Sequence, residues 1–182
     1  MSVGGYKIRD QYAKHYFTFT VIDWIDVFTR KRYKDIILDS LEYCQKEKQL
    51  AIHSYVIMSN HIHCILSSKT GKLSDTVREF KSHTSKKIIE AIHEEPESRR
   101  EWMLALFERN GLSNSRNKQF QFWKQSNHPI ELHTNHFTDQ KMNYIHNNPV
   151  EAGWVEKPEE YLYSSAKNYA GEVGLIEVEL IV

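Results

Sequence analysis

Two histidines one residue apart are the first candidates for chemistry in this sequence. His61 and His63 lie in the segment YVIMSNHIHCIL, a run of β-branched and apolar residues that favours a β-strand. Because side chains alternate along a strand, both imidazoles project from one face, where they can share a cation. Two ligands hold a divalent cation poorly, so a metal site needs a third oxygen or nitrogen donor from elsewhere. On pattern alone, a surface pair or a hydrogen-bonded core pair is the more common explanation.

A second candidate pair lies in the segment HFTDQKMNYIHNNPV. Tyr144 and Asn148 are four residues apart, which places them on one face of a helix, about one turn from each other. A phenol that can act as a nucleophile and an amide that can bind a metal could thus lie side by side. A core aromatic residue next to a helix-ending amide is the simpler interpretation, and local pattern does not decide between the two.

The helix that must carry Tyr144 has clear boundary signals. We expect Thr138 to cap its start, with Asp139 in the first turn, where the helix dipole favours an acid. Pro149 disfavours helical angles at the residue before it. The sequence therefore predicts a helix from about residue 139 to 147 or 148.

Upstream of this helix, the sequence predicts alternating strands and helices. Apolar runs indicate strands at 15–28, 49–58 and 61–68, and within 118–133. Helical periodicity indicates helices at 33–48, at 72–93 with Ser74 as cap, and a shorter one ending near Gly111. Ser59 and Asn60 suit a tight turn, so the second and third strands should form a hairpin. The order β-α-β-β-α-β predicts an α+β, ferredoxin-like or RRM-like sandwich: an antiparallel sheet with helices on one face, and a C-terminal helix carrying the tyrosine.

Composition is that of an ordinary globular protein. The chain has 182 residues, 40% hydrophobic and 26% charged, which predicts one domain over 1–182 with a core at about 15–171. No apolar run approaches the roughly 18 residues that cross a bilayer, and the N-terminus lacks a secretory signal, so we expect a cytoplasmic protein without a membrane partner. Cys44 and Cys64 fall in a predicted helix and strand and are expected to be reduced core thiols.

Charge is balanced overall but uneven along the chain. The formal net charge is zero, yet residues 69–87 contain six Lys or Arg against two Asp or Glu, and the tail from Glu151 contains seven Glu against two Lys. A local phosphate-binding face on a neutral protein is compatible with this distribution. Two differently solvated faces explain it equally well.

Three segments in this order carry a resemblance to a known family: YVIMSNHIHCIL, VREFKSHTSKKI and YIHNNPVEAGWV, followed by YLYSSAKNYAG. Together they resemble the single-tyrosine HUH transposases, in particular the branch of REP-associated tyrosine transposases. The similarity extends over about residues 15–171. Ser59 stands where relatives often have proline, a difference that a turn tolerates.

The resemblance implies a role for each candidate residue. His61 and His63 would be metal ligands for Mg²⁺ or Mn²⁺, and Tyr144 would be the nucleophile. Asn148 would complete the metal site, with Asn147 or His146 as alternatives. The implied reaction is metal-dependent cleavage and rejoining of single-stranded DNA at hairpin-flanked sites, through a covalent 5′-phosphotyrosine intermediate.

The implied partner is single-stranded DNA that contains hairpins. Cationic and aromatic residues that we expect to contact it are Arg78, Lys81, Lys86, Lys87, Arg116, Lys118 and Trp123. Lys141 is a candidate for assisting ionisation of the phenol. The resemblance leaves open the DNA sequence, the physiological metal and the choice between a monomer and a homodimer. The alternative function is a non-catalytic or domesticated protein that binds single-stranded hairpins or repeats.

Overall fold

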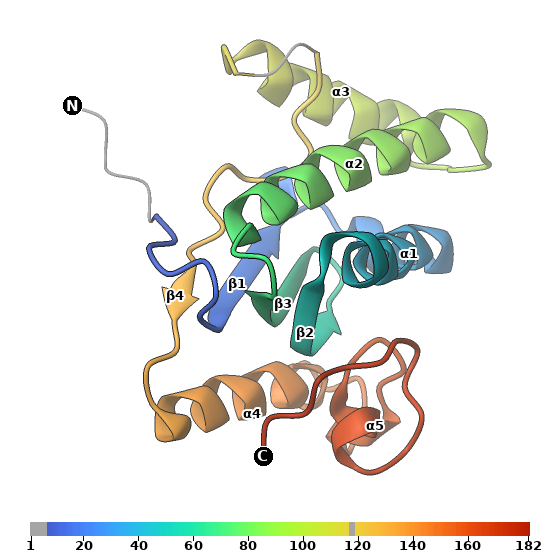
Figure 1. The fold of residues 1–182 in the computed structure, drawn as a ribbon. Coiled ribbons are helices and arrows are strands. Elements are labelled where there is room, and N and C mark those ends of the chain that lie inside the picture. Colours follow the sequence, from blue (N-terminus) through green and yellow to red (C-terminus); the bar gives the residue numbers. More distant parts are fainter. Residues whose placement is uncertain (1–6, 117–118) are drawn as a thin grey trace.

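The computed structural model describes residues 7–116 and 119–182 and contains one four-stranded antiparallel sheet (Figure 1). Its strands, in the spatial order β2-β3-β1-β4, are β1 His15–Thr20, β2 Leu50–Ile57, β3 His61–Ser68 and β4 Ile130–Glu131. The helices are α1 Lys31–Lys48, α2 Leu73–Glu94, α3 Arg100–Leu112, α4 Asn135–Glu151 and the short α5 Ala166–Tyr169. The predicted α+β fold is confirmed.

The two faces of the sheet bury different clusters. Helices α1 and α2 cover one face, where apolar side chains such as Phe19, Ile37 and Phe80 form the main core, and α3 extends this core beside α2 (Figure 1). Helix α4 lies against the other face, where Ile145 packs on Val56 and neighbouring residues. Helices therefore lie on both faces of the sheet, not on one face as predicted, and the second face is partly covered by the helix that carries the tyrosine.

The hairpin of β2 and β3 forms as predicted. The N–H of Met58 donates to the carbonyl oxygen of His61 at 2.9 Å, which closes the turn made by Ser59 and Asn60. Along β3, the even-numbered residues from Ile62 enter the main core. The odd-numbered residues consequently face α4, and this alternation places His61 and His63 on the α4 side.

Helix α4 begins and ends differently from the prediction. Thr134, not Thr138, is the N-cap, and its hydroxyl accepts the N–H of Phe137 at 3.2 Å. The helix also continues through Pro149, whose ring is buried, because a proline removes only one hydrogen bond from the ladder. Gly153, at φ +73°, then provides the left-handed residue that ends the helix. Tyr144 and Asn148 thus lie well inside the helix, with a full turn on each side.

Other element boundaries were also predicted imperfectly. The strand predicted over 15–28 ends at Thr20, because the chain turns away through the 3₁₀ turn Ile22–Trp24. Of the strand predicted within 118–133, only β4 and an isolated bridge at Trp123 pair with the sheet. Ser74 is not the helix cap, because α2 begins one residue earlier, at Leu73, and Lys72 occupies the N-cap position.

The segment after α4 closes the edge of the sheet. The N–H of Ile57 donates to the carbonyl oxygen of Tyr163, and the N–H of Ser165 donates to that of Tyr55. These bonds satisfy the outer side of β2, which would otherwise be an open edge. Cys44 and Cys64 are both buried and unpaired, as predicted. Among the described residues, no helix is long and apolar enough to cross a membrane.

Candidate functional site

The two histidines and the tyrosine come together in one chain. The ring centroids of His61 and His63 are 4.6 Å apart, and that of Tyr144 is 5.2 Å from that of His63. His63 is only 5% exposed, whereas Tyr144 is 52% exposed although it is a large aromatic residue. The site therefore combines a sheltered imidazole with a phenol that a macromolecular substrate can reach.

Asn60 determines which nitrogen of His61 is free. Its Nδ2 donates to the carbonyl oxygen of Trp24 at 3.2 Å, and because a carbonyl only accepts, the amide oxygen must face His61. That Oδ1 lies 2.7 Å from the Nδ1 of His61, which therefore carries the proton. The Nε2 of His61 remains as an unprotonated nitrogen that can bind a metal.

His63 is oriented by two hydroxyl groups of the neighbouring strand. Its Nδ1 lies 2.7 Å from the phenolic oxygen of Tyr16 and 3.0 Å from the Oγ1 of Thr18. Both oxygens can accept a proton from Nδ1, and that tautomer leaves Nε2 as a second metal-binding nitrogen. Sequence reasoning missed both residues. Their alternation on β1 was a usable signal, but the β1–β3 register that pairs Thr18 with His63 is a tertiary feature.

Both imidazoles are held in the neutral form. Burial lowers the pKa of His61, and burial together with the nearby His61 and Lys141 lowers the pKa of His63 to about 3. Neutral imidazole is the form that coordinates a cation. Two imidazoles with ring centroids 4.6 Å apart, each with its Nδ1 already hydrogen-bonded, offer two Nε2 atoms to a divalent metal ion that takes further oxygen ligands.

The third ligand is less completely defined than the pair. The Nδ2 of Asn148 donates to the carbonyl oxygen of Tyr144 at 3.1 Å, so its Oδ1 is the atom left for a cation. His146 is not a suitable alternative, because its buried ring bonds through Nε2 to the Oγ of Ser165 at 2.8 Å. Asn147 is more exposed than Asn148, and its Nδ2 donates in the same way to the carbonyl oxygen of Asn143 at 3.0 Å, so its Oδ1 is also left for a cation. Within the described part of the chain, no cluster of three or more His, Cys, Asp or Glu could hold a metal.

A cation lies beside the tyrosine. The Nζ of Lys141 is 4.7 Å from the ring centroid of Tyr16 and 6.0 Å from that of Tyr144. The Tyr16 ring is also edge-on to Tyr144 at 6.4 Å. The positive charge of Lys141 attracts an anionic group such as a phosphate to this position.

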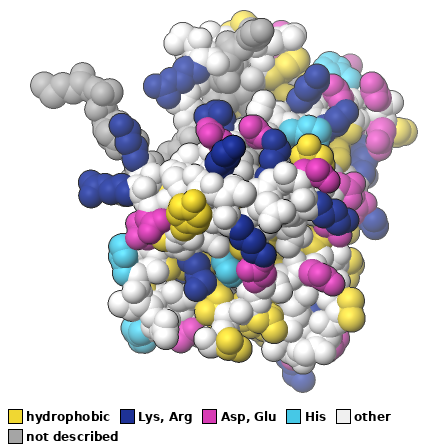
Figure 2. All heavy atoms as spheres, in the orientation of Figure 1, with side chains coloured by type: hydrophobic (Ala, Val, Ile, Leu, Met, Phe, Trp, Pro, Cys, Tyr) yellow, Lys and Arg dark blue, Asp and Glu magenta, His cyan; other side chains and the backbone are white. Residues whose placement is uncertain are grey.

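Four of the residues expected to contact DNA lie on the surface. Arg78, Lys86 and Lys87 project from α2 and form ion pairs with acidic residues on the same helix, and Arg116 is exposed on the loop after α3. On the face drawn in Figure 2, Lys and Arg are interspersed with Asp and Glu and do not form one continuous patch. Lys118 lies outside the described residues.

Two of the residues expected to contact DNA are engaged within the protein instead. The Nζ of Lys81 donates to the carbonyl oxygens of Lys124 and Gln125 and to the Oδ1 of Asn127, and burial lowers its pKa to about 8. Trp123 is only 5% exposed, and its Nε1 donates to the Oγ1 of Thr84. The prediction that Trp123 stacks on bases is wrong, because its ring belongs to the core.

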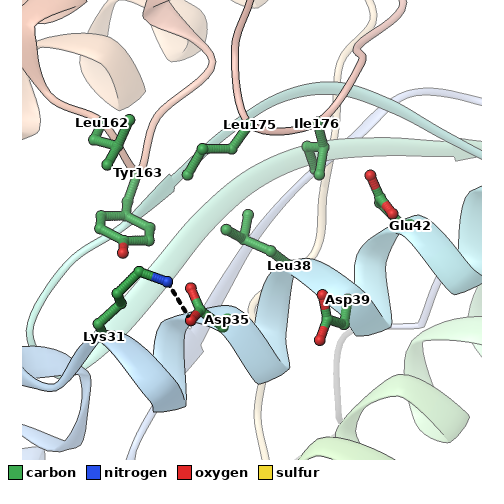
Figure 3. Close-up of a pocket in the computed structure, with 9 residues that line it drawn as sticks. All are labelled: Lys31, Asp35, Leu38, Asp39, Glu42, Leu162, Tyr163, Leu175 and Ile176. Carbon is green, nitrogen blue, oxygen red and sulfur yellow. Dashed lines mark hydrogen bonds and ion pairs between the residues drawn. The ribbon is translucent and has the colours of Figure 1, made fainter.

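A cavity of about 180 Å³ lies away from this site, between α1 and the C-terminal segment (Figure 3). Three carboxylates, those of Asp35, Asp39 and Glu42, line it, and Lys31 pairs with the first of them at 2.6 Å. Carboxylates repel a phosphodiester, and neither the histidines nor Tyr144 line this cavity. It is therefore unsuited to bind DNA.

Comparison with known proteins defines the class of this protein. The chain matches the family described as "Transposase IS200 like" over residues 10–110, more than half of its length. It therefore belongs to the IS200-like transposase family, as the resemblance implied. No curated protein matches the sequence significantly.

One solved structure shares the fold over almost the whole chain. A REP-associated tyrosine transposase bound to a REP hairpin is similar with a TM-score of 0.65 and 14% sequence identity, over 99% of this chain and 94% of that chain. A crystal structure of a putative transposase from Deinococcus radiodurans R1 has a TM-score of 0.44 and 16% identity, over 81% of this chain and 97% of that chain. The first similarity covers almost the whole chain and supports the α+β fold from β1 to the C-terminal segment.

Proposed function

We propose that the protein is a metal-dependent endonuclease and strand transferase for single-stranded DNA, with Tyr144 as nucleophile and His61, His63 and Asn148 as metal ligands. The observation that carries this proposal is the position of Tyr144, exposed on α4 with its ring 5.2 Å from that of His63. A half-exposed phenol beside two neutral imidazoles is accessible to a substrate and close to the proposed metal ligands. The solved relative with a bound REP hairpin supports DNA with a hairpin as the substrate.

The proposed reaction exchanges one ester for another. The Oη of Tyr144 forms a bond to phosphorus as the P–O3′ bond breaks. The phenolic proton passes to water, and the leaving 3′ oxygen takes up a proton from water to become a hydroxyl. Lys141, whose Nζ lies 6.0 Å from the ring centroid of Tyr144, would attract the phosphate group by its charge. When bound, Mg²⁺ or Mn²⁺ would polarise the phosphate oxygens and stabilise the charge that develops on them. Because the 5′-phosphotyrosine keeps the ester bond, a 3′-hydroxyl of another strand can reverse the reaction without a nucleotide cofactor.

The proposed nucleophile and the histidine pair come from a single chain. His61 and His63 come from β3 and Tyr144 from α4 of the same molecule, and their rings are already in contact distance. This arrangement supports a monomer as the catalytic unit, since a homodimer is not needed to bring the nucleophile to the ligands. Single-stranded DNA suits the site because a stacked duplex hinders in-line attack by a side chain on a helix.

Substitution of the nucleophile tests the proposal. Tyr144→Phe should abolish the covalent adduct with 3′-end-labelled single-stranded DNA spanning the flanks of the gene, while hairpin affinity stays within about threefold, because only one exposed hydroxyl is lost. EDTA should also prevent the adduct in the wild-type protein. The matched control is Tyr43→Phe, which changes another exposed tyrosine, on α1, and should leave the adduct unchanged.

The outcomes separate the two candidate functions. An adduct that persists in Tyr144→Phe would refute the assignment of the nucleophile. Hairpin binding by the wild type without any adduct, at any metal concentration, would favour the non-catalytic binding protein instead.

A further inference from the structure

An exposed tryptophan stands next to the histidine pair and has no role in the proposed chemistry. Trp24 is 56% exposed, and its ring lies edge-on to that of His61 at a centroid distance of 6.2 Å. It lies in the 3₁₀ turn Ile22–Trp24, between β1 and α1. Trp24 thus presents a large aromatic surface directly beside the candidate site, where a bound substrate can contact it.

The backbone is strained at this point. Asp23 and Trp24 have φ values of 52° and 56°, in the left-handed region that residues other than glycine seldom adopt. The carboxylate of Asp23 is held on α3 by the Nδ2 of Asn110 at 2.8 Å and by the Nη2 of Arg109 at 3.3 Å. Such strain persists only where the surrounding structure maintains it, and it is concentrated at binding and catalytic sites.

One side chain connects this turn to the metal-binding pair. Asn60 accepts from the Nδ1 of His61 and donates to the carbonyl oxygen of Trp24. The same amide therefore sets the orientation of His61 and the position of the turn that presents Trp24. A substrate that contacts Trp24 is thus held at a defined place relative to His61.

A cation lies over one face of the exposed ring. The Nζ of Lys124 is 4.0 Å from the ring centroid of Trp24, and the backbone N–H of Lys124 donates to the carbonyl oxygen of Thr20. In the described part of the chain, no carboxylate pairs with this ammonium. An aromatic face and an unpaired ammonium are the two components that recognise a nucleobase and its phosphate in a single strand.

We propose that Trp24 is a stacking platform for a nucleobase of single-stranded DNA, adjacent to the phosphodiester that the His61–His63 pair binds, and that Lys124 contacts a phosphate beside it. This inference rests on the proposed function, because it takes DNA as the substrate. Stacking on Trp24 holds the strand unstacked and extended next to the histidines. Trp24 and Lys124 thus select single strands over duplexes, whose bases are not free to stack on protein.

The test compares DNA with and without bases. The Tyr144→Phe protein, which cannot form an adduct, is titrated with the single strands (dT)12 and (dA)12 and with an abasic strand of equal length. Trp24→Ala in this background should weaken binding of the base-containing strands by roughly 5- to 150-fold and leave the abasic strand unaffected. Trp24→Phe should restore most of the lost affinity. Lys124→Gln should weaken binding of all three strands and reduce the slope of log affinity against log salt by about 0.7.

Matched controls separate stacking from damage to the fold. Trp102, 52% exposed on α3, offers the equivalent change away from the histidines, so Trp102→Ala should not alter binding of any strand. The proposal is overturned if Trp24→Ala lowers the affinity for abasic and base-containing strands equally, or lowers neither. The adduct assay on the wild-type protein, which retains Tyr144, is a separate measurement. Base-dependent loss without any wild-type adduct would support the platform and refute the nuclease.

Discussion

Removal of the Tyr16 hydroxyl tests whether hydrogen bonds to Nδ1 prepare His63 for a metal. Tyr16→Phe deletes the closer of the two oxygens near Nδ1, at 2.7 Å, and leaves the Oγ1 of Thr18 at 3.0 Å. The aromatic ring stays, so its packing against His63 and its contact with Lys141 are retained. The variant therefore changes one hydrogen bond and little else.

The expected size of the effect follows from this geometry. Loss of an outer hydrogen bond to a ligating histidine lowers metal affinity by about 10- to 100-fold. Because Thr18 still accepts from Nδ1, we expect the lower end, about 10-fold, or about 1.4 kcal/mol. The free energy of unfolding should fall by a further amount typical of one buried hydrogen bond, about 1 kcal/mol.

The assay measures the tautomer and the metal separately. Mn²⁺ binding is followed by paramagnetic broadening of the histidine ring resonances, and long-range ¹⁵N–¹H spectra of the metal-free protein report which nitrogen of His63 is protonated. The matched control is Tyr161→Phe, which removes a hydroxyl that donates to the carbonyl oxygen of Ile57 at 2.7 Å. Tyr161→Phe should lower the free energy of unfolding about as much as Tyr16→Phe does, but it should leave the Mn²⁺ affinity unchanged. Equal Mn²⁺ affinities of Tyr16→Phe and the wild type would refute the reasoning, as would a wild-type His63 protonated on Nε2.

Two further predictions concern stability. Trp123→Ala should lower the free energy of unfolding by about 3–5 kcal/mol, measured by urea denaturation, because it empties a core position and breaks the bond to Thr84; a loss below about 1 kcal/mol would contradict its burial. Burial alone would raise the pKa of the Glu97 carboxyl, but the hydrogen bonds and charge of Arg99 and a hydrogen bond from Tyr33 lower it to about 2. The pKa of a glutamate in the unfolded chain is about 4.3. The ionised Glu97 carboxyl therefore stabilises the folded protein above that pH, and the free energy of unfolding should fall by roughly 1–3 kcal/mol as the pH drops towards 2. Glu97→Gln should remove this part of the pH dependence.

Prediction of the site from sequence succeeded where the geometry is local. Alternation along one strand and spacing along one helix depend only on backbone repeat, so the shared face of His61 and His63 and the helical position of Tyr144 were accessible in advance. Helix ends were harder to predict. Thr134 and Thr138 are both good caps, and only the fold determined that the first one starts α4.

The DNA-binding residues were predicted less well, because the charge or aromaticity of a residue does not show whether its side chain points to solvent or into the protein. Lys81 lies on α2 only three residues after the exposed Arg78, yet its ammonium donates hydrogen bonds to the loop at 124–127. Trp123 and Trp24 are both tryptophans near the ends of apolar segments, yet one is buried and the other is exposed. No local pattern distinguishes them.

The sequence by itself determined the order of strands and helices, the common face of the two histidines and the family, because each depends on residues close together in the chain. Only the tertiary structure decided that Tyr144 lies against His63, that Tyr16 and Thr18 hold the Nδ1 of that histidine, and that Trp24 stands beside the pair. These contacts join segments tens of residues apart. They are set by strand register and helix docking, which arise from packing of the whole core and leave no signature in local spacing.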